Sequence, residues 1–185
     1  MGAQLSISES DVQELKVQSN FTEEELKKLH RRFQKLDLNN NGTLSTSEFL
    51  EIPALEQNPL VHRVISIFDD DESGEVDFRE FINALSIFAG QDNHKEKLIF
   101  AFKLYDVNKD GFISNGDLFT VLKTMVGDNL DDLQLQQLVD RTILQADKDK
   151  DGKLSFVEFT EMVKDSGIEE KLTLDVFSDS GAITS

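Results

Sequence analysis

Apolar residues recur at every third or fourth position in eight separate segments of this chain. This spacing places them on one face of an α-helix, because a helix completes a turn about every 3.6 residues. Only two prolines and ten glycines are present, so the chain is not rich in loops. The pattern predicts an all-α protein whose main helices include residues 26–36, 49–52, 60–68, 78–88, 98–105, 118–126, 135–143 and 156–163.

Polar breaks divide this helical pattern. Residues 7–16 predict a short helical turn, and the capping-box spacing of Thr22 and Glu25 marks the start of the first long helix. Gly90 and Asn93 interrupt the pattern near the middle of the chain. The sequence therefore predicts an N-terminal segment at 1–20, an N-lobe at 21–88, a linker at 89–94, a C-lobe at 95–167 and a C-terminal tail at 168–185.

An acidic stretch in the C-terminal half has the spacing of a calcium-binding loop. Asp147, Asp149 and Asp151 alternate, Gly152 follows at position 6, and Glu158 closes the stretch at position 12. A hard cation such as Ca²⁺ takes about six to eight oxygen ligands, which a loop supplies by wrapping round the ion. An ordinary acidic surface loop is the simpler alternative, but it does not account for this spacing. The stretch fits the EF-hand loop.

The same pattern occurs three more times, beginning at Asp37, Asp69 and Asp106. Positions 1, 3, 5 and 12 offer side-chain oxygens, and position 7 offers its backbone carbonyl. The sequence therefore predicts up to four Ca²⁺ sites. Their ligands are Asp37, Asn39, Asn41, Thr43 and Glu48; Asp69, Asp71, Ser73, Glu75 and Glu80; Asp106, Asn108, Asp110, Phe112 and Asp117; and Asp147, Asp149, Asp151, Lys153 and Glu158.

Each loop has an apolar residue at position 8, namely Leu44, Val76, Ile113 or Leu154. This residue lets two loops pair through a short antiparallel contact. We expect the first loop to pair with the second and the third with the fourth. The predicted fold is thus two lobes, each a pair of EF-hands.

The four loops differ at their ligand positions. The first has neutral Asn39 and Asn41 at positions 3 and 5, so less negative charge faces the ion. The third ends in Asp117, which is one methylene shorter than Glu and reaches the ion less easily with both oxygens. Mg²⁺ is satisfied by six-fold coordination. We expect the second and fourth loops to fill first and the third to be the most tolerant of Mg²⁺.

The amino-acid composition limits which partners and which cellular compartment are expected. Nineteen basic and 36 acidic residues give a net charge of −17, so nucleic acid is not an expected partner. Cysteine is absent, which excludes disulfides and thiolate metal sites and is compatible with the cytosol. No apolar run approaches the about 18 residues that a membrane span needs, and no secretory signal is visible. We expect a cytoplasmic protein.

The first residues fit an N-myristoylation signature. With Met1 removed, Gly2 is followed by Ser6 at the required spacing. An ordinary N-terminus is the alternative. No polybasic segment follows, so one acyl chain gives only weak, reversible membrane attachment or lies on the protein itself. We expect myristate at Gly2 and weak or no attachment to membranes.

No catalytic arrangement is apparent. His30, His62 and His94 are isolated, and no phosphate-binding glycine loop accompanies them. The acidic pairs are accounted for by the four loops. We therefore expect a non-catalytic protein.

The helices carry more large apolar residues than one small lobe is expected to hide. In open EF-hands such a surplus forms a groove that binds an amphipathic helix. Here Phe, Leu, Ile and Val would wall it, because only three methionines are present. Methionine-rich grooves suit many partners. A methionine-poor groove therefore favours one fixed partner.

Several stretches beyond the ligand positions carry a more specific pattern. They are Arg32-Phe-Gln-Lys-Leu-Asp37, Asn58-Pro-Leu60, Gly74-Glu-Val-Asp-Phe78, Lys109-Asp-Gly-Phe-Ile-Ser-Asn-Gly116, residues 122–130 and Gln134-Leu-Gln-Gln-Leu138. With them, residues 21–176 resemble the regulatory B subunits of calcineurin, a calcium-dependent Ser/Thr protein phosphatase. EF-hand proteins in general share the loops but not these stretches.

This resemblance implies a mechanism. A groove along both lobes clasps a long amphipathic helix of the catalytic A subunit, and Ca²⁺ in the tighter sites holds the heterodimer together. Filling of the weaker sites, with calmodulin acting on the A subunit, relieves autoinhibition. The resemblance also implies that Gly2 is acylated.

The resemblance further implies a docking surface for substrates and immunophilin–drug complexes. The matching residues are Leu122, Met125, Val126 and Leu130. Thr124, Asp131, Asp117 and the tail beyond Val176 depart from the family pattern.

Two other functions fit the loops. A stand-alone myristoylated sensor, of the neuronal-calcium-sensor or calcineurin-homologous type, usually has one or two disabled loops, whereas all four look complete here. A calcium buffer barely opens and needs no surplus apolar surface.

Overall fold

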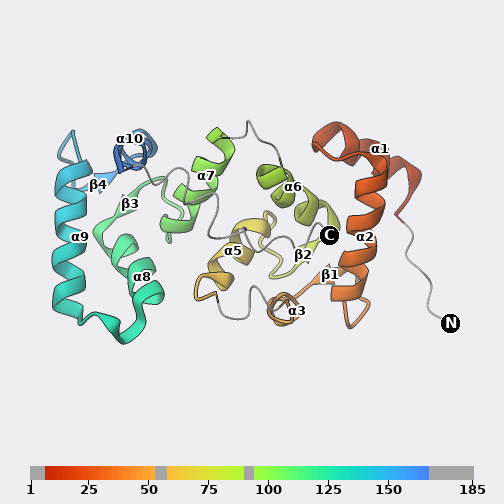
Figure 1. The fold of residues 1–185 in the computed structure, drawn as a ribbon, viewed down its shortest axis with the longest axis horizontal. Helices are drawn as coiled ribbons and strands as arrows, with labels where there is room; N and C mark the ends of the chain where they lie inside the picture. Colours follow the sequence, from red (N-terminus) through yellow and green to blue (C-terminus); the bar gives the residue numbers. More distant parts are fainter. Residues whose placement is uncertain (1–6, 53–57, 90–93, 167–185) are drawn as a thin grey trace. The chain divides into compact units, whose positions relative to one another are not determined.

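The structure is a computed structural model that describes residues 7–52, 58–89 and 94–166. The chain divides into two compact units, Met1–Asn93 and His94–Ser185. The N-terminal unit contains α1 (Glu9–Gln18), α2 (Glu23–Leu36), β1 (Thr43–Leu44), α3 (Thr46–Leu50), α5 (Val61–Phe68), β2 (Val76–Asp77) and α6 (Phe78–Ala89) (Figure 1). The C-terminal unit contains α7 (His94–Tyr105), β3 (Ile113–Ser114), α8 (Asn115–Val126), the 3₁₀ helix η1 (Gly127–Asn129), α9 (Asp132–Ala146), β4 (Lys153–Leu154) and α10 (Phe156–Ser166).

The all-α prediction is confirmed, and the helix start predicted at Thr22 has the expected cap. The turn expected at 7–16 is helix α1, whose N-cap Ser8 accepts a hydrogen bond from the Asp11 N–H. Thr22 and Glu25 form the predicted capping box at the start of α2. Both caps satisfy N–H groups that have no partner inside the helix.

As predicted from the apolar residue at position 8, the first loop pairs with the second and the third with the fourth. β1 pairs with β2 antiparallel, with Leu44 opposite Val76, and β3 pairs with β4, with Ile113 opposite Leu154 (Figure 1). These four side chains are at most 1% exposed. The residue at position 8 therefore both pairs the two loops and anchors them in the core of their unit.

Aromatic rings fill the core of the N-terminal unit. The Phe33 ring lies edge to face against Phe78 and Phe81, at centroid distances of 5.4 and 5.5 Å. Phe49 contacts Phe68 at 6.4 Å in the same manner. These contacts join α2 to α6 and α3 to α5. Edge-to-face pairs add about 0.5–1.5 kcal/mol beyond the area they bury.

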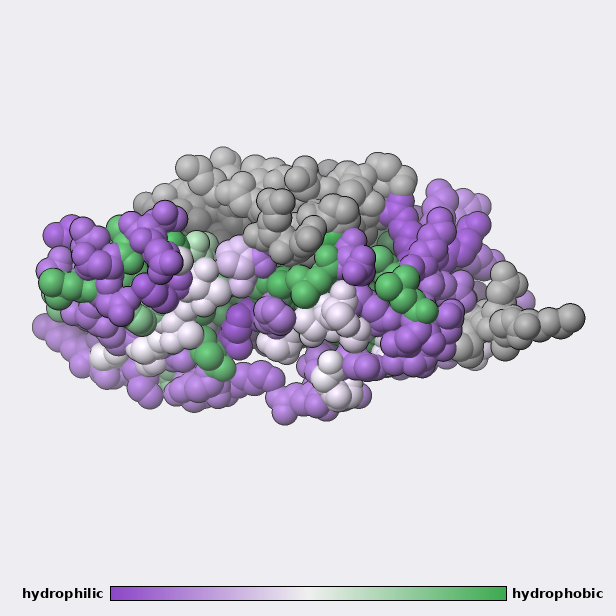
Figure 2. Space-filling view, turned by 90° about the horizontal axis from the view of Figure 1, so that it is seen from below, coloured by the Kyte–Doolittle hydropathy of each residue, from purple (hydrophilic) through white to green (hydrophobic). Residues whose placement is uncertain are grey.

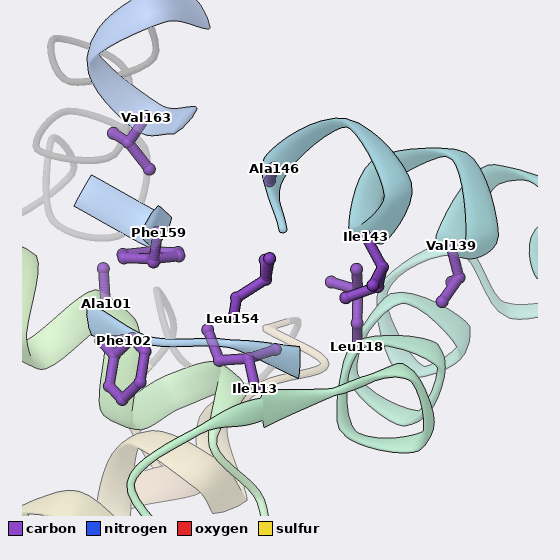
Figure 3. Close-up of a cluster of buried hydrophobic side chains, with 10 residues drawn as sticks. All are labelled: Ala101, Phe102, Ile113, Leu118, Val139, Ile143, Ala146, Leu154, Phe159 and Val163. Carbon is purple, nitrogen blue, oxygen red and sulfur yellow. The ribbon is translucent and has the colours of Figure 1, made fainter. Parts of the chain in front are cut away.

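The core of the C-terminal unit combines side chains from its helices and both strands (Figure 3). Ile113 and Leu154 lie next to each other on the paired strands (Figure 3). Phe159 packs against Phe102 with ring centroids 5.5 Å apart. The position of both loops is thus fixed by the same cluster that holds the helices together.

Helix α1 is attached to the unit mainly by packing. Val12 and Leu15 are 4% and 2% exposed. The Arg79 guanidinium on α6 donates to both carboxylate oxygens of Glu14, at 2.8 and 3.1 Å. An exposed ion pair contributes only about 0–1 kcal/mol, whereas each buried aliphatic side chain contributes about 1.5–3 kcal/mol.

Most phenylalanines expected to wall an open groove are core residues in this conformation. Phe33, Phe49, Phe81, Phe102 and Phe159 are each less than 10% exposed. Figure 2 shows hydrophilic residues between and around hydrophobic patches on the face that it draws. Among the described residues, the exposed large hydrophobic side chains are Val17, Leu38, Phe112, Met125, Leu133, Leu138, Leu144 and Val157.

The expected apolar surplus is thus largely buried, because aromatic rings pack against one another. None of the described helices combines the length and apolar composition needed to cross a membrane.

Candidate metal centres

All four loops have the same backbone conformation at the tip. Position 4, occupied by Asn40, Glu72, Lys109 and Lys150, has a φ of 57° to 64°, and the glycine at position 6 has a φ of 84° to 89°. At the φ of position 6, which is still larger than that of position 4, residues with a Cβ are strained. A Cβ on any of the four glycines would meet no atom within 4 Å. The backbone angle, not crowding, therefore requires glycine.

The aspartate at position 1 organises each tip. In all four loops its Oδ2 accepts a hydrogen bond from the position-6 glycine N–H, at 2.8–3.0 Å. In the first three loops its Oδ1 also accepts from the position-5 N–H, at 2.9–3.1 Å. These donors hold the carboxylates of Asp37, Asp69, Asp106 and Asp147 toward the inside of their loops.

The glutamate at position 12 spans three of the loops. In loop 4, Glu158 Oε1 accepts from the N–H groups of Lys148 and Asp149 at 2.8 and 3.3 Å, while Oε2 accepts from the Ser155 N–H at 2.9 Å. Glu48 and Glu80 make the corresponding contacts, at 2.9, 3.3 and 2.9 Å. Each of these carboxylates connects the first residues of its loop to the start of the following helix.

The third loop differs at this position. Asp117 Oδ2 accepts from the Ser114 N–H at 2.9 Å and from the Ser114 hydroxyl at 2.5 Å. Within the described part of the chain, no hydrogen bond joins Asp117 to the N–H groups of Val107 or Asn108, which occupy positions 2 and 3. The missing methylene thus leaves this carboxylate on one side of its loop.

Burial singles out the same carboxylates. Among the described residues, the buried charged side chains are Asp37, Glu48, Asp106, Asp117 and Glu158, at 4–7% exposed. Each occupies position 1 or position 12 of a loop. Burying a carboxylate is unfavourable unless hydrogen bonds or a cation compensate it. Backbone N–H groups supply part of that compensation here.

Two loops bring three carboxylates into one cluster. Oxygen atoms of Asp69, Asp71 and Glu80 lie within 4.8 Å of one another in loop 2, and Asp147, Asp149 and Asp151 do the same in loop 4. These are the loops expected to fill first. A set made of oxygen donors alone fits a hard cation such as Ca²⁺ or Mg²⁺ rather than a soft one.

Mutual repulsion acts within the loop 4 cluster. The Asp151 N–H lowers the pKa of Asp149, but desolvation and the charges of Asp151, Glu158 and Asp147 outweigh it and leave that pKa raised. A bound divalent cation would relieve this repulsion. The cluster therefore gains more from a cation than isolated carboxylates would.

Glu158 is expected to stay ionised in acid when divalent ions are absent. The N–H and hydroxyl of Ser155, aided by the N–H groups of Lys148 and Asp149, lower its pKa from 4.5 to about 2. Because the folded pKa is depressed, its stabilising contribution is present above pH 4.5 and is lost as the pH falls toward 2. NMR titration of the Glu158 carboxyl carbon in chelator should find it ionised at pH 4, and Ser155→Ala should raise its midpoint. A midpoint near 4.5 in the unsubstituted protein would contradict this.

The EF-hand domain pair family matches residues 26–86 and 95–164. The calcineurin B subunit of Naegleria gruberi is 56% identical over 169 residues, or 91% of this chain and 96% of the relative. The type 2 calcineurin B subunit of Homo sapiens is 57% identical over 158 residues, which are 85% of this chain and 93% of the relative. The type 1 calcineurin B subunit of Dictyostelium discoideum is 52% identical over 177 residues, or 95% and 98%.

The chain belongs to the calcineurin B family. The resemblance predicted from the sequence is therefore confirmed. The spans that match the EF-hand domain pair contain all four loops.

In three of the four loops, the serine at position 9 has a role that was not predicted. Position 9 of loops 1, 3 and 4 is the N-cap of the following helix, where Ser45, Ser114 and Ser155 each accept from the position-12 N–H at 3.2–3.4 Å. The serine hydroxyls also donate to the position-12 carboxylates. The capping-box spacing of position 9 and position 12 was the available signal.

The residues that matched a docking surface of calcineurin B proteins lie around the end of α8. Met125 is 47% exposed, while Leu122, Val126 and Leu130 are half-buried. Leu122 also packs against the C-terminal core. Leu133, at the start of α9, is 69% exposed and was not predicted.

One departure from the family pattern near this surface has a structural role. Asp131 is the N-cap of α9 and forms a capping box with Gln134.

Gly2, residues 90–93 of the predicted linker and the tail at 168–185 lie outside the described residues.

Proposed function

We propose that this chain is the calcium-binding regulatory subunit of a calcineurin-type Ser/Thr protein phosphatase. The main support is that its sequence is more than 50% identical to proteins named as calcineurin B subunits, over nearly the whole length of those proteins. The four loops, each with its ligand positions occupied by oxygen donors, agree with this role. The phosphatase chemistry would then belong to a separate catalytic subunit.

Calcium would be held by positions 1, 3, 5, 7 and 12 of the four loops. The carboxylate clusters in loops 2 and 4 favour early filling of these sites. The one-sided contacts of Asp117 support a third site that tolerates Mg²⁺, since Mg²⁺ needs only six ligands. The neutral ligands Asn39 and Asn41 make the first site less charged.

The partner would be an amphipathic helix of the catalytic A subunit. Binding it would require the EF-hands to open, because the described conformation buries most of their phenylalanines. The surface around Met125 is proposed as a docking site for substrates and immunophilin–drug complexes. We further propose a cytoplasmic location, with myristate on Gly2 and weak or no membrane attachment.

Affinity capture of this chain from its own cytosol tests the proposal. The capture is done once in Ca²⁺ and once in chelator, and the washed material is assayed on a phosphopeptide. We expect a larger partner at a 1:1 ratio that survives the chelator. Adding Ca²⁺ and calmodulin should then restore dephosphorylation, which a mock capture without the chain should not show.

Other outcomes would favour the alternative functions. Partners that appear only with Ca²⁺ and carry no phosphatase activity would indicate a stand-alone sensor. A chain that binds Ca²⁺ but captures no partner would indicate a buffer.

A further inference from the structure

Side chains at position 7 of the second and fourth loops cross to the neighbouring loop. Glu75 belongs to loop 2 but contacts Asn41 and Thr43 of loop 1. Lys153 belongs to loop 4 but contacts Asp110 and Phe112 of loop 3. In both pairs, position 7 therefore reaches positions 5 and 7 of the partner loop.

In the first pair the crossing side chain is negative. Glu75 Oε2 accepts a hydrogen bond from Asn41 Nδ2 at 3.0 Å and another from the Thr43 hydroxyl. Because Glu75 takes the NH₂ end of the Asn41 amide, the oxygen end remains on the loop side. There Asn41 Oδ1 accepts from the Thr43 N–H at 3.0 Å. Glu75 thus brings charge to a loop with neutral ligands and orients one of them.

In the second pair the crossing side chain is positive. Lys153 Nζ lies 3.8 Å from Asp110 Oδ2 and 5.3 Å from the centre of the Phe112 ring. The ion pair and the cation–π contact both stabilise the Lys153 ammonium group beside the third loop. Asp110 is the predicted ligand at position 5 of loop 3, so Lys153 neutralises part of the charge that would attract a cation.

We infer that Glu75 raises the cation affinity of the first loop across the pair, and that Lys153 lowers that of the third. This inference rests on the proposed function, since it assumes that the loops bind Ca²⁺. The ligand expected from position 7 is its backbone carbonyl, so the side chain is available to act on the partner loop.

The size of the effect follows from charge and exposure. A charge a few ångströms from a divalent ion changes its affinity strongly in a protein interior but much less in water. Lys153 and Asp110 are 44% and 37% exposed, so solvent screens their interaction. We expect each crossing side chain to change the affinity of the partner loop by about three- to tenfold, with a smaller change at high salt.

Site-resolved Ca²⁺ titration tests this inference. The position-6 glycine amides, which donate to the position-1 aspartates, report each loop separately by NMR. Glu75→Gln keeps an acceptor for Asn41 but removes the charge, and should weaken binding reported by Gly42. Lys153→Gln should strengthen binding reported by Gly111.

Matched variants separate a local effect from net charge. Asp70→Asn removes one negative charge from loop 2, and Lys150→Gln removes one positive charge from loop 4. Both side chains are exposed, and in the described part of the chain neither contacts the partner loop. Each control should change the Ca²⁺ affinity of the partner loop by less than about twofold, because solvent and salt screen exposed charges well.

Two results would overturn the inference. Unchanged midpoints of Gly42 in Glu75→Gln and Gly111 in Lys153→Gln would show that the crossing side chains do not act on affinity. Equal shifts in the matched controls would assign the effect to net charge. If the unsubstituted chain bound no Ca²⁺, the proposed function would fail first and the inference with it.

Discussion

Glu158→Gln should abolish high-affinity Ca²⁺ binding at the fourth loop. The substitution removes one charge and one of two carboxylate oxygens from position 12. Its NH₂ group would also face backbone N–H donors that now bond to Glu158, and leaving such donors unpaired costs about 1–3 kcal/mol. Changes in the surroundings of metal ligands alone lower affinity by about 10–100-fold. We therefore expect a loss on the order of 100-fold.

Calorimetry should count one ion fewer in this variant, and the Gly152 amide should no longer respond at low Ca²⁺. Glu161→Gln is the matched control, because Glu161 lies on the same helix and its side chain is 45% exposed. It pairs with Lys148 at the surface, so its loss should change affinity by no more than about threefold. Unaltered binding in Glu158→Gln would remove loop 4 from the set of calcium sites.

Asp117→Glu should strengthen Ca²⁺ binding at the third loop by about tenfold or more. The added methylene would let the carboxylate reach the N–H groups of Val107 and Asn108, as Glu158 reaches their counterparts in loop 4. Both oxygens would then be available to one ion, which favours Ca²⁺ over six-coordinate Mg²⁺. Titrations of the Gly111 amide with Ca²⁺, in the presence and absence of Mg²⁺, measure both effects.

The reverse substitution gives an internal check. Glu158→Asp should give the fourth loop the weaker, more Mg²⁺-tolerant behaviour expected of the third. Asp128→Glu adds the same methylene at an exposed residue outside the loops and should leave the Gly111 midpoint unchanged. If Asp117→Glu also leaves it unchanged, side-chain length does not limit the third site.

The fold and the loops were accessible from the sequence because their determinants are close together along the chain. The glycine at position 6, the alternating oxygen donors and the residue at position 12 all act within one loop. The start of α2 was equally local, since Thr22 and Glu25 are three residues apart and cap the helix themselves. The pairing of the loops also followed from one apolar residue at position 8.

Other features depended on contacts between distant residues. Phenylalanine spacing indicated helices, but only packing decided that Phe33 and Phe81 face each other in the core rather than line an open groove. Likewise, no local pattern connects Glu14 to Arg79, 65 residues away. The sequence predicted that the short Asp117 side chain extends less far than a glutamate. Only the folded loop showed that, among the described residues, it makes no hydrogen bonds to the N–H groups at positions 2 and 3.

By itself, the sequence determined the four loops, their unequal charges, the helices around them and the family. These properties follow from residue type and spacing over a dozen residues. The tertiary structure decided which side chains meet across the paired loops. Glu75 reaches Asn41, 34 residues away, and Lys153 reaches Asp110. Such contacts depend on strand register and on the direction of each side chain, which arise only when two distant segments pack together.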